Sequence, residues 1–157
     1  MLFPAGRATR IMAGVNDPFN LQRFIDAQDG VFGTAICELR SGSKRSHWMW
    51  FVFPQLAGLG RSPTAQYYGI VSLDEARAYL EHPLLVSRLH EAVGAILAWD
   101  ARSSAEQIFG PLDAVKLRSS LTLFDQVEPG GLCAQALEAF YGGRRDERTL
   151  ALLNGQA

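Results

Sequence analysis

Apolar residues recur at helical spacing along most of this chain, and residues that start or stop helices separate the runs. In the first run, Leu21, Phe24 and Ile25 fall on one face of a helix and Arg23 falls on the opposite face. Asp17-Pro18 precedes this run as an N-cap followed by proline at the first helical position, where the missing N–H costs nothing. The pattern predicts a helix over residues 18–28.

A second run at helical spacing, Phe32 to Leu39, is followed by Gly42, a residue suited to the left-handed conformation that ends many helices. The basic turn that comes next contains Lys44 and Arg45. Cations are favoured near the C-terminus of a helix because of the helix dipole. This placement gives the basic turn a structural reason, which competes with any functional one.

The aromatic segment from Trp48 to Phe53 fits two structures. Its aromatic and β-branched residues favour a strand by propensity. A strand needs partners, however, and elsewhere only residues 67–71 alternate weakly. We therefore expect a short buried helix over 48–53, with a strand as the alternative, and a loop over 56–64, which contains two glycines and a proline.

The rest of the chain contains further helices with recognisable caps. Ser72 and Glu75 match the capping box ahead of a helix over 73–81. Pro83 opens what we expect to be the longest helix, because its apolar stripe continues to Leu97. The remaining helices are expected to follow caps at Ser103 or Ser104, at Asp113 and at Asp146, with one more over Leu132 to Tyr141.

Together these segments predict an all-α protein, a single compact orthogonal bundle of about eight short-to-medium helices joined by short loops. A length of 157 residues suits one domain. We assign residues 17–157 to the helical domain and residues 1–16 to a flexible N-terminal arm, because the first clear helix signal comes at Asp17.

Composition narrows the functional classes. The net charge of −1 and the lack of a basic face argue against nucleic-acid binding, and no apolar stretch is long enough to cross a bilayer. We expect both cysteines, Cys37 and Cys133, to be reduced core thiols, which fits a cytoplasmic protein. With three scattered histidines they match no zinc motif, so we expect neither a metal nor another cofactor.

The basic turn and the aromatic segment after it bring together more binding chemistry than any other stretch. Lys44 and Arg45 could neutralise a phosphate or carboxylate. Trp48 or Trp50 could stack on a base, and His47 is of the residue type that carries protons near neutral pH. The competing interpretation is that the aromatic side chains belong to the core and the basic pair is solvated.

A second constellation lies on the predicted helix that follows Asp113. Lys116, Ser119 and Ser120 are three and four residues apart, on one side of the helix next to its apolar stripe. Two serines beside a lysine are poor choices for core packing in a leucine-rich helix, so we predict that this side lines a polar cavity. The order of lysine and serine, and the lack of a Gly-x-Ser-x-Gly elbow, do not favour a nucleophilic serine.

Carboxylates and phosphate motifs give weaker signals. Asp74, Glu75 and Glu81 occupy positions typical of caps and solvated helix faces. The charged run Arg144 to Arg148 is expected to be a solvated helix start. There is no glycine-rich phosphate loop and no Rossmann fingerprint.

Several motifs resemble those of one small bacterial and fungal family, a domain of unknown function that is sometimes labelled calpastatin-like. The resemblance covers about residues 17 to 153 and implies a compact, mainly helical, cytoplasmic domain. This chain departs from the family pattern after Leu84, where the family usually has a glycine. The motifs that carry the resemblance include Lys44-Arg45-Ser46-His47-Trp48-Met49-Trp50-Phe51, Phe53-Pro54-Gln55 and Lys116-Leu117-Arg118-Ser119-Ser120.

A more distant likeness is to the YbiA-like superfamily of small helical N-glycoside hydrolases, which act on ADP-ribose or phosphoribosyl compounds. The shared features are a polar start to a buried helix and a late helix that carries a lysine. A likeness of fold does not transfer a site, so it adds no residue to the candidates.

Two functions remain open at this point. The first is hydrolysis of an N-glycosidic bond in a nucleotide or ADP-ribose-like ligand, with His47 or Asp113 handling the water as candidate catalytic groups. The second is a non-enzymatic ligand-binding, protein-interaction or regulatory module with the same pocket. Both imply a small phosphorylated or anionic ligand and leave the oligomeric state open. The candidate ligand-binding residues are Lys44, Arg45, Trp48, Trp50, Lys116, Ser119 and Ser120.

Overall fold

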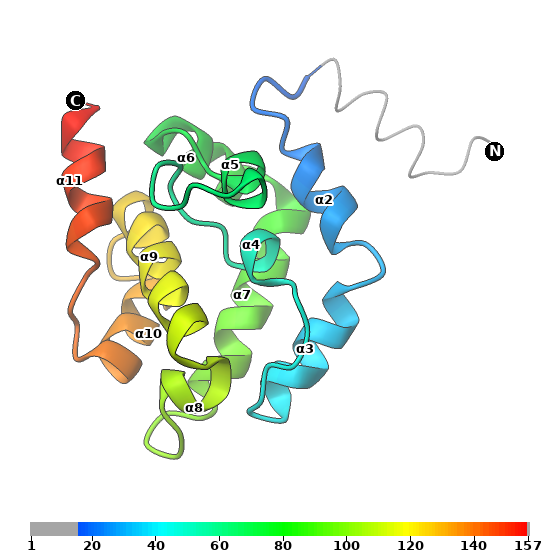
Figure 1. Cartoon of the computed structure of the whole chain (residues 1–157), viewed down its shortest axis with the longest axis vertical. Helices are drawn as coiled ribbons and strands as arrows, with labels where there is room; N and C mark the ends of the chain where they lie inside the picture. Colours follow the sequence, from blue (N-terminus) through cyan, green and yellow to red (C-terminus); the bar gives the residue numbers. More distant parts are fainter. Residues whose placement is uncertain (1–15, 157) are drawn as a thin grey trace.

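Two long helices, α7 (Pro83–Leu97) and α9 (Pro111–Val127), form the centre of the fold. In the computed structural model, which describes residues 16–156, α9 packs against α6, α8, α10 and α11, and α7 packs against α3, α4, α6 and α10 (Figure 1). Apart from Asn16, the predicted N-terminal arm lies outside the described residues.

The all-α prediction is confirmed. Across residues 16–156 no strand forms, and a single parallel bridge joins Leu56 to Ile70. The strand candidate at 67–71 was therefore wrong, since α5 already occupies its first two positions. In this part of the chain ten helices replace the eight expected; besides α7 and α9 they are α2 (Gln22–Gln28), α3 (Phe32–Arg40), α4 (Met49–Val52), α5 (Pro63–Tyr68), α6 (Leu73–Glu81), α8 (Ala105–Phe109), α10 (Leu132–Tyr141) and α11 (Glu147–Gly155).

The short helix α4 settles the ambiguity of the aromatic segment. It lies in the middle of the fold, with α7 behind it and α5 above it (Figure 1). Trp48, Met49, Val52 and Phe53 are all buried. A four-residue helix has little stability of its own, so burial of these side chains holds the segment in place.

Most of the predicted caps form. Ser104 and Gln107 make a full capping box at α8, and Asp146 accepts a hydrogen bond from the Thr149 N–H at the start of α11. Ser72 caps α6 through the Glu75 N–H, but the Glu75 side chain does not return the bond to Ser72. The Glu75 carboxylate instead accepts the Val71 N–H and forms an ion pair with Arg23.

Gly42 ends α3 with a left-handed backbone, φ 75°. A Cβ atom at this position would lie 2.9 Å from the Trp99 ring, whose Nε1 donates a hydrogen bond to the Leu39 carbonyl. Both the backbone angle and the close approach of the indole therefore require glycine.

Two helix starts differ from the prediction. The first helix begins at Gln22 instead of residue 18, because both carboxylate oxygens of Asp17 accept backbone N–H groups, from Leu21 and Gln22. The other is α9, where Gly110 (φ 81°) precedes Pro111 at the first helical position. Asp113 is therefore not a cap. This earlier start also makes α9, with 17 residues, longer than α7, with 15, so the Pro83 helix is not the longest.

Arg23 was predicted on the solvated face of the first helix, and this was wrong. Its side chain is buried, and its guanidinium donates to the carbonyls of Phe19, Asn20, Tyr67 and Gly69. It also forms a 2.7 Å ion pair with Glu75. A guanidinium has five donors in a fixed fork, and here it ties the start of α2 to the segment that leads into α6.

Only one of the two cysteines is a core thiol. Cys133 is buried, and burial raises its pKa to about 12. Cys37 is exposed on α3, so the prediction for it was wrong. Its position in the apolar run of α3 did not reveal which side of that helix faces α7.

The buried ion pair gives a testable expectation for stability. Glu75→Gln leaves the Arg23 charge buried without its carboxylate, and we expect a loss of about 3–5 kcal/mol in the free energy of unfolding, measured by urea denaturation. Arg77→Gln serves as control, because the Arg77–Asp74 pair is exposed and should change stability by about 0.5 kcal/mol or less. Equal losses in both variants would contradict the assignment.

Candidate functional site

The Glu38 carboxylate organises the basic turn that follows α3. It accepts hydrogen bonds from the backbone N–H groups of Arg45 and Ser46, from the Ser46 hydroxyl and from Trp48 Nε1 at 2.9 Å. One side chain thus holds the turn and the buried indole together. Partial burial would raise the pKa of Glu38, but these four hydrogen bonds outweigh it and lower the pKa from 4.5 to about 2.

The aromatic segment divides between the core and a cavity. Trp48 and Phe53 are buried and meet Phe109 edge-on, with ring centroids 6.3 and 6.0 Å from it. Trp50 is only half-buried, and Lys116 Nζ lies 5.0 Å from its ring centroid. The indole that can meet a ligand is therefore Trp50, whereas Trp48 serves the core.

Asp113 brings the two predicted constellations together. Lys44 Nζ lies 2.8 Å from one of its carboxylate oxygens, and Lys116 Nζ lies 3.1 Å from the other. The Lys44 side chain is only 8% exposed, and its Nζ also donates to the Ser46 carbonyl. Burial alone would raise the pKa of Asp113, but the two lysines outweigh it and lower the pKa, so the carboxyl group is ionised at neutral pH.

A cavity of about 290 Å³ opens beside this join, between the end of α4, the first turns of α9 and the start of α11. Trp50, Leu59 and Val115 contribute apolar walls, and Ser119 contributes a hydroxyl group. Lys116, on the side of α9 for which we predicted a polar cavity, lines this cavity as well. The remaining lining residues are Gln55, Gly60, Leu112, Asp146 and Arg148.

The two serines of α9 are not equivalent. Ser119 Oγ donates to Asp146 Oδ2 at 3.2 Å and faces the cavity. Ser120 is fully buried and does not line the cavity, and its hydroxyl makes no hydrogen bond to any residue among 16–156. Ser120 therefore belongs to the packed interior of the helix bundle.

Two other candidates do not contribute to the lining of this cavity. Arg45 and His47 are exposed, and neither lines it. Trp48 and Asp113 also lie outside the lining. The roles predicted for these four residues stay predictions, but the geometry places Asp113 as the partner of two lysines and not at the cavity surface.

Three polar residues of the cavity were not predicted as site residues. Gln55 appeared only as the end of the aromatic segment, Asp146 only as a helix cap and Arg148 only as part of a solvated run. Asp146 and Arg148 reach the cavity because α11 packs against α9, and Gln55 reaches it from the segment that follows α4. The spacing of residues along the sequence does not predict that these three side chains meet at one cavity.

Positive charge exceeds negative charge around this cavity. Lys44 already neutralises the charge of Asp113 through their buried ion pair, and Arg118 lies 3.9 Å from Asp146. Lys116 and Arg148 at the cavity remain to balance a further negative charge. The site is therefore suited to an anion that enters beside apolar walls.

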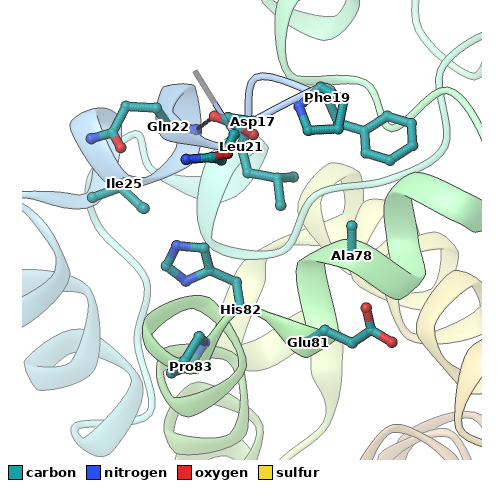
Figure 2. A pocket seen from close by; sticks show the side chains of 11 residues that line it. Asp17, Phe19, Leu21, Gln22, Ile25, Ala78, Glu81, His82 and Pro83 are labelled. Carbon is teal, nitrogen blue, oxygen red and sulfur yellow. Dashed lines mark hydrogen bonds between the residues drawn. The ribbon is translucent and has the colours of Figure 1, made fainter. Parts of the chain in front are cut away.

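A larger cavity, of about 470 Å³, lies between the start of α2 and the turn from α6 to α7 (Figure 2). Leu21, Ala78 and the His82 ring point into it. None of the candidate residues lines it, and its charged groups are the carboxylates Asp17 and Glu81. Asp17 and His82 already accept backbone N–H groups as caps. Without a lysine or arginine in its lining, this cavity is poorly suited to an anion.

Residues 16–156 contain neither a cluster of metal ligands nor a helix that could span a membrane. No group of three or more His, Cys, Asp or Glu side chains is arranged to hold a metal ion there. Within the same residues, no helix combines the length and apolar character that crossing a bilayer requires.

Comparisons with known proteins place the chain in a family. A family model described as "Protein of unknown function (DUF1810)" matches residues 18–153. The chain belongs to this family. The predicted membership of a family of unknown function is thereby confirmed, whereas the motif signature and the likeness to the YbiA-like superfamily stay predictions.

Among solved structures, this DUF1810 chain is similar to that of the conserved hypothetical protein Rv1873 from Mycobacterium tuberculosis. The two are 52% identical, the match covers 88% of this chain and 99% of that chain, and the TM-score is 0.84. No curated protein matches the chain. The solved structure thus has the same fold as this chain, and its description names no activity.

The lowered pKa of Glu38 predicts a pH-dependent stability. Its ionised form stabilises the fold fully above its ordinary pKa of 4.5, and this contribution is lost as the pH falls toward about 2. At pH 7 we expect Glu38→Gln to lower the free energy of unfolding by about 2 kcal/mol, as for a hydrogen-bonded charge. The difference from the unchanged protein should shrink between pH 4.5 and pH 3 in urea titrations.

Glu91→Gln is the control for this experiment, because Glu91 is exposed and forms only an exposed ion pair with Arg40. A stability difference for Glu38→Gln that stays constant from pH 7 to pH 3 would contradict the assignment.

Proposed function

We propose that this protein binds a small phosphorylated ligand, nucleotide-like in character, in the cavity between α4, α9 and α11. The observation that carries the proposal is the placement of Lys116 and Arg148 at a cavity whose walls are apolar. Small-molecule sites generally combine apolar walls with a few convergent polar groups. The cationic groups would hold the phosphate, and Trp50 would provide an apolar wall for a ring.

The ion pairs of Asp113 support this assignment of roles. Lys44 is buried by its contact with Asp113 and is not free to meet a ligand. Lys116 is more exposed, at 24%, and it also lies over Trp50. We therefore assign Lys116 to phosphate binding and Lys44 with Asp113 to positioning Lys116. Such preorganisation lowers the entropic cost of ligand binding.

The phosphate role of Lys116 can be tested by calorimetry with adenosine 5′-monophosphate and ribose 5-phosphate at low ionic strength. Loss of one charge-assisted hydrogen bond, as in Lys116→Met, should raise the Kd of both ligands about tenfold or more. Arg144→Met is the control, since Arg144 is exposed and does not line the cavity. Unchanged Kd values in Lys116→Met would refute the proposed site.

A second candidate function, hydrolysis of an N-glycosidic bond, is favoured by Asp146. This carboxylate is buried at the cavity, and its Oδ2 accepts from Ser119, the Thr149 N–H and the Thr149 hydroxyl. Its Oδ1 makes no hydrogen bond to another described residue and lies 3.9 Å from Arg118. A fixed carboxylate of this kind could orient a water or stabilise the positive charge that develops on a sugar carbon.

Enzyme and binding module are distinguished by turnover. If the protein is a hydrolase, incubation with adenosine 5′-monophosphate should release adenine and ribose 5-phosphate, and incubation with ADP-ribose should release adenine, at a measurable rate. Asp146→Asn should lower that rate at least about a hundredfold, as removal of one preorganised electrostatic group does. Asparagine can still cap α11, so ligand binding should persist. Equal turnover in both proteins would exclude the role of Asp146.

A further inference from the structure

Gln55 is a largely buried residue whose side-chain amide makes no hydrogen bond within the described part of the chain. The residue is 9% exposed and lines the cavity between α4, α9 and α11. Its backbone carbonyl accepts the Ile70 N–H, but no hydrogen bond joins its side-chain amide to another described residue. The amide nitrogen and oxygen are not among the fully buried unpaired atoms of residues 16–156, so they stay accessible at the cavity and can pair with a ligand that enters it.

The backbone on both sides of Gln55 is held in place. Phe53 and Leu56 on either side are 1% exposed, and Pro54 restricts the chain between them. The Leu56–Ile70 bridge fixes the segment from the other side. A fixed backbone leaves only the side-chain torsions of Gln55 to be ordered when a ligand binds, which limits the entropic cost of binding.

An amide presents one donor and one acceptor side by side. The matching ligand edge has an adjacent acceptor and donor, as heterocyclic bases have, and such paired contacts discriminate by about 1–3 kcal/mol. A flat ring also suits the apolar walls formed by Trp50, Leu59 and Val115. The volume of about 290 Å³ lies at the lower end of ligand sites, which fits one ring and its sugar.

We propose that Gln55 is the specificity-determining residue of this cavity and that its amide pairs with the edge of a heterocyclic base in a ligand of mononucleotide size. This inference rests on the proposed function, because Lys116 and Arg148 hold the phosphate of the same ligand. It adds the class of the ring, a base with adjacent donor and acceptor groups. It also assigns that recognition to a residue outside the phosphate-binding set.

The test compares a ligand with a base and one without. Calorimetry on the full chain should show that adenosine or uridine 5′-monophosphate binds at least about tenfold more tightly than ribose 5-phosphate. In Gln55→Met, which keeps the length of the side chain but removes the amide, the Kd of the nucleotides should rise about tenfold. The Kd of ribose 5-phosphate should stay unchanged.

Two further variants complete the experiment. Gln135→Met is the matched control, because Gln135 is exposed on α10 and does not line the cavity; it should leave every Kd unchanged. Gln55→Asn keeps the amide but shortens the side chain, and it replaces Gln55→Met if that variant does not fold. It too should weaken only the binding of the nucleotides.

The outcomes separate this inference from the proposed function. If Lys116→Met weakens ribose 5-phosphate binding but Gln55→Met affects neither ligand, the phosphate site stands and the role of Gln55 is overturned. If Gln55→Met raises the Kd of the nucleotides and of ribose 5-phosphate equally, Gln55 maintains the shape of the cavity but does not recognise the base. The inference is then overturned as well. If none of the three ligands binds the unchanged protein, both proposals fail together.

Discussion

Asp113 holds the candidate site together through two ion pairs. One carboxylate oxygen contacts Lys44 and the other contacts Lys116, so the basic turn after α3 and the first turns of α9 share one anion. Lys44 is almost fully buried in this contact, and removing one partner of a buried pair leaves a costly uncompensated charge. The turn therefore stays against α9, and the position of Trp50 beside Lys116 depends on that contact.

Other carboxylates of the fold also hold backbone in place. Asp17 caps the start of α2, Glu38 fixes the basic turn, and Glu75 receives the buried guanidinium of Arg23. All three use their oxygens within the protein. Asp146 differs, because one of its oxygens makes no hydrogen bond to another described residue although the side chain lines the cavity. This difference is why the candidate chemistry is assigned to Asp146.

Sequence reasoning succeeded where local rules decide. Apolar spacing located the helices, and the Ser104 and Asp146 caps formed as expected, because these bonds involve residues three apart. It failed for Arg23, which helical spacing placed outside. Three of the partners of that side chain, Tyr67, Gly69 and Glu75, lie far away in sequence, and a pattern within one helix does not contain them. The start of α9 was misplaced because Asp113 was taken as a cap, although Gly110-Pro111 already satisfied the rules for a helix start.

By itself, the sequence determined that this protein is helical and that the basic turn and the α9 residues beginning at Lys116 carry unusual polar chemistry. Both follow from residue type and spacing along one helix or turn. Only the tertiary structure decided that Trp50 faces a cavity while Trp48 is buried, and that Gln55 and Arg148 share that cavity. The reason is physical: a cavity forms where α4, α9 and α11 fail to fill the space between them, and that depends on packing between segments far apart in the chain.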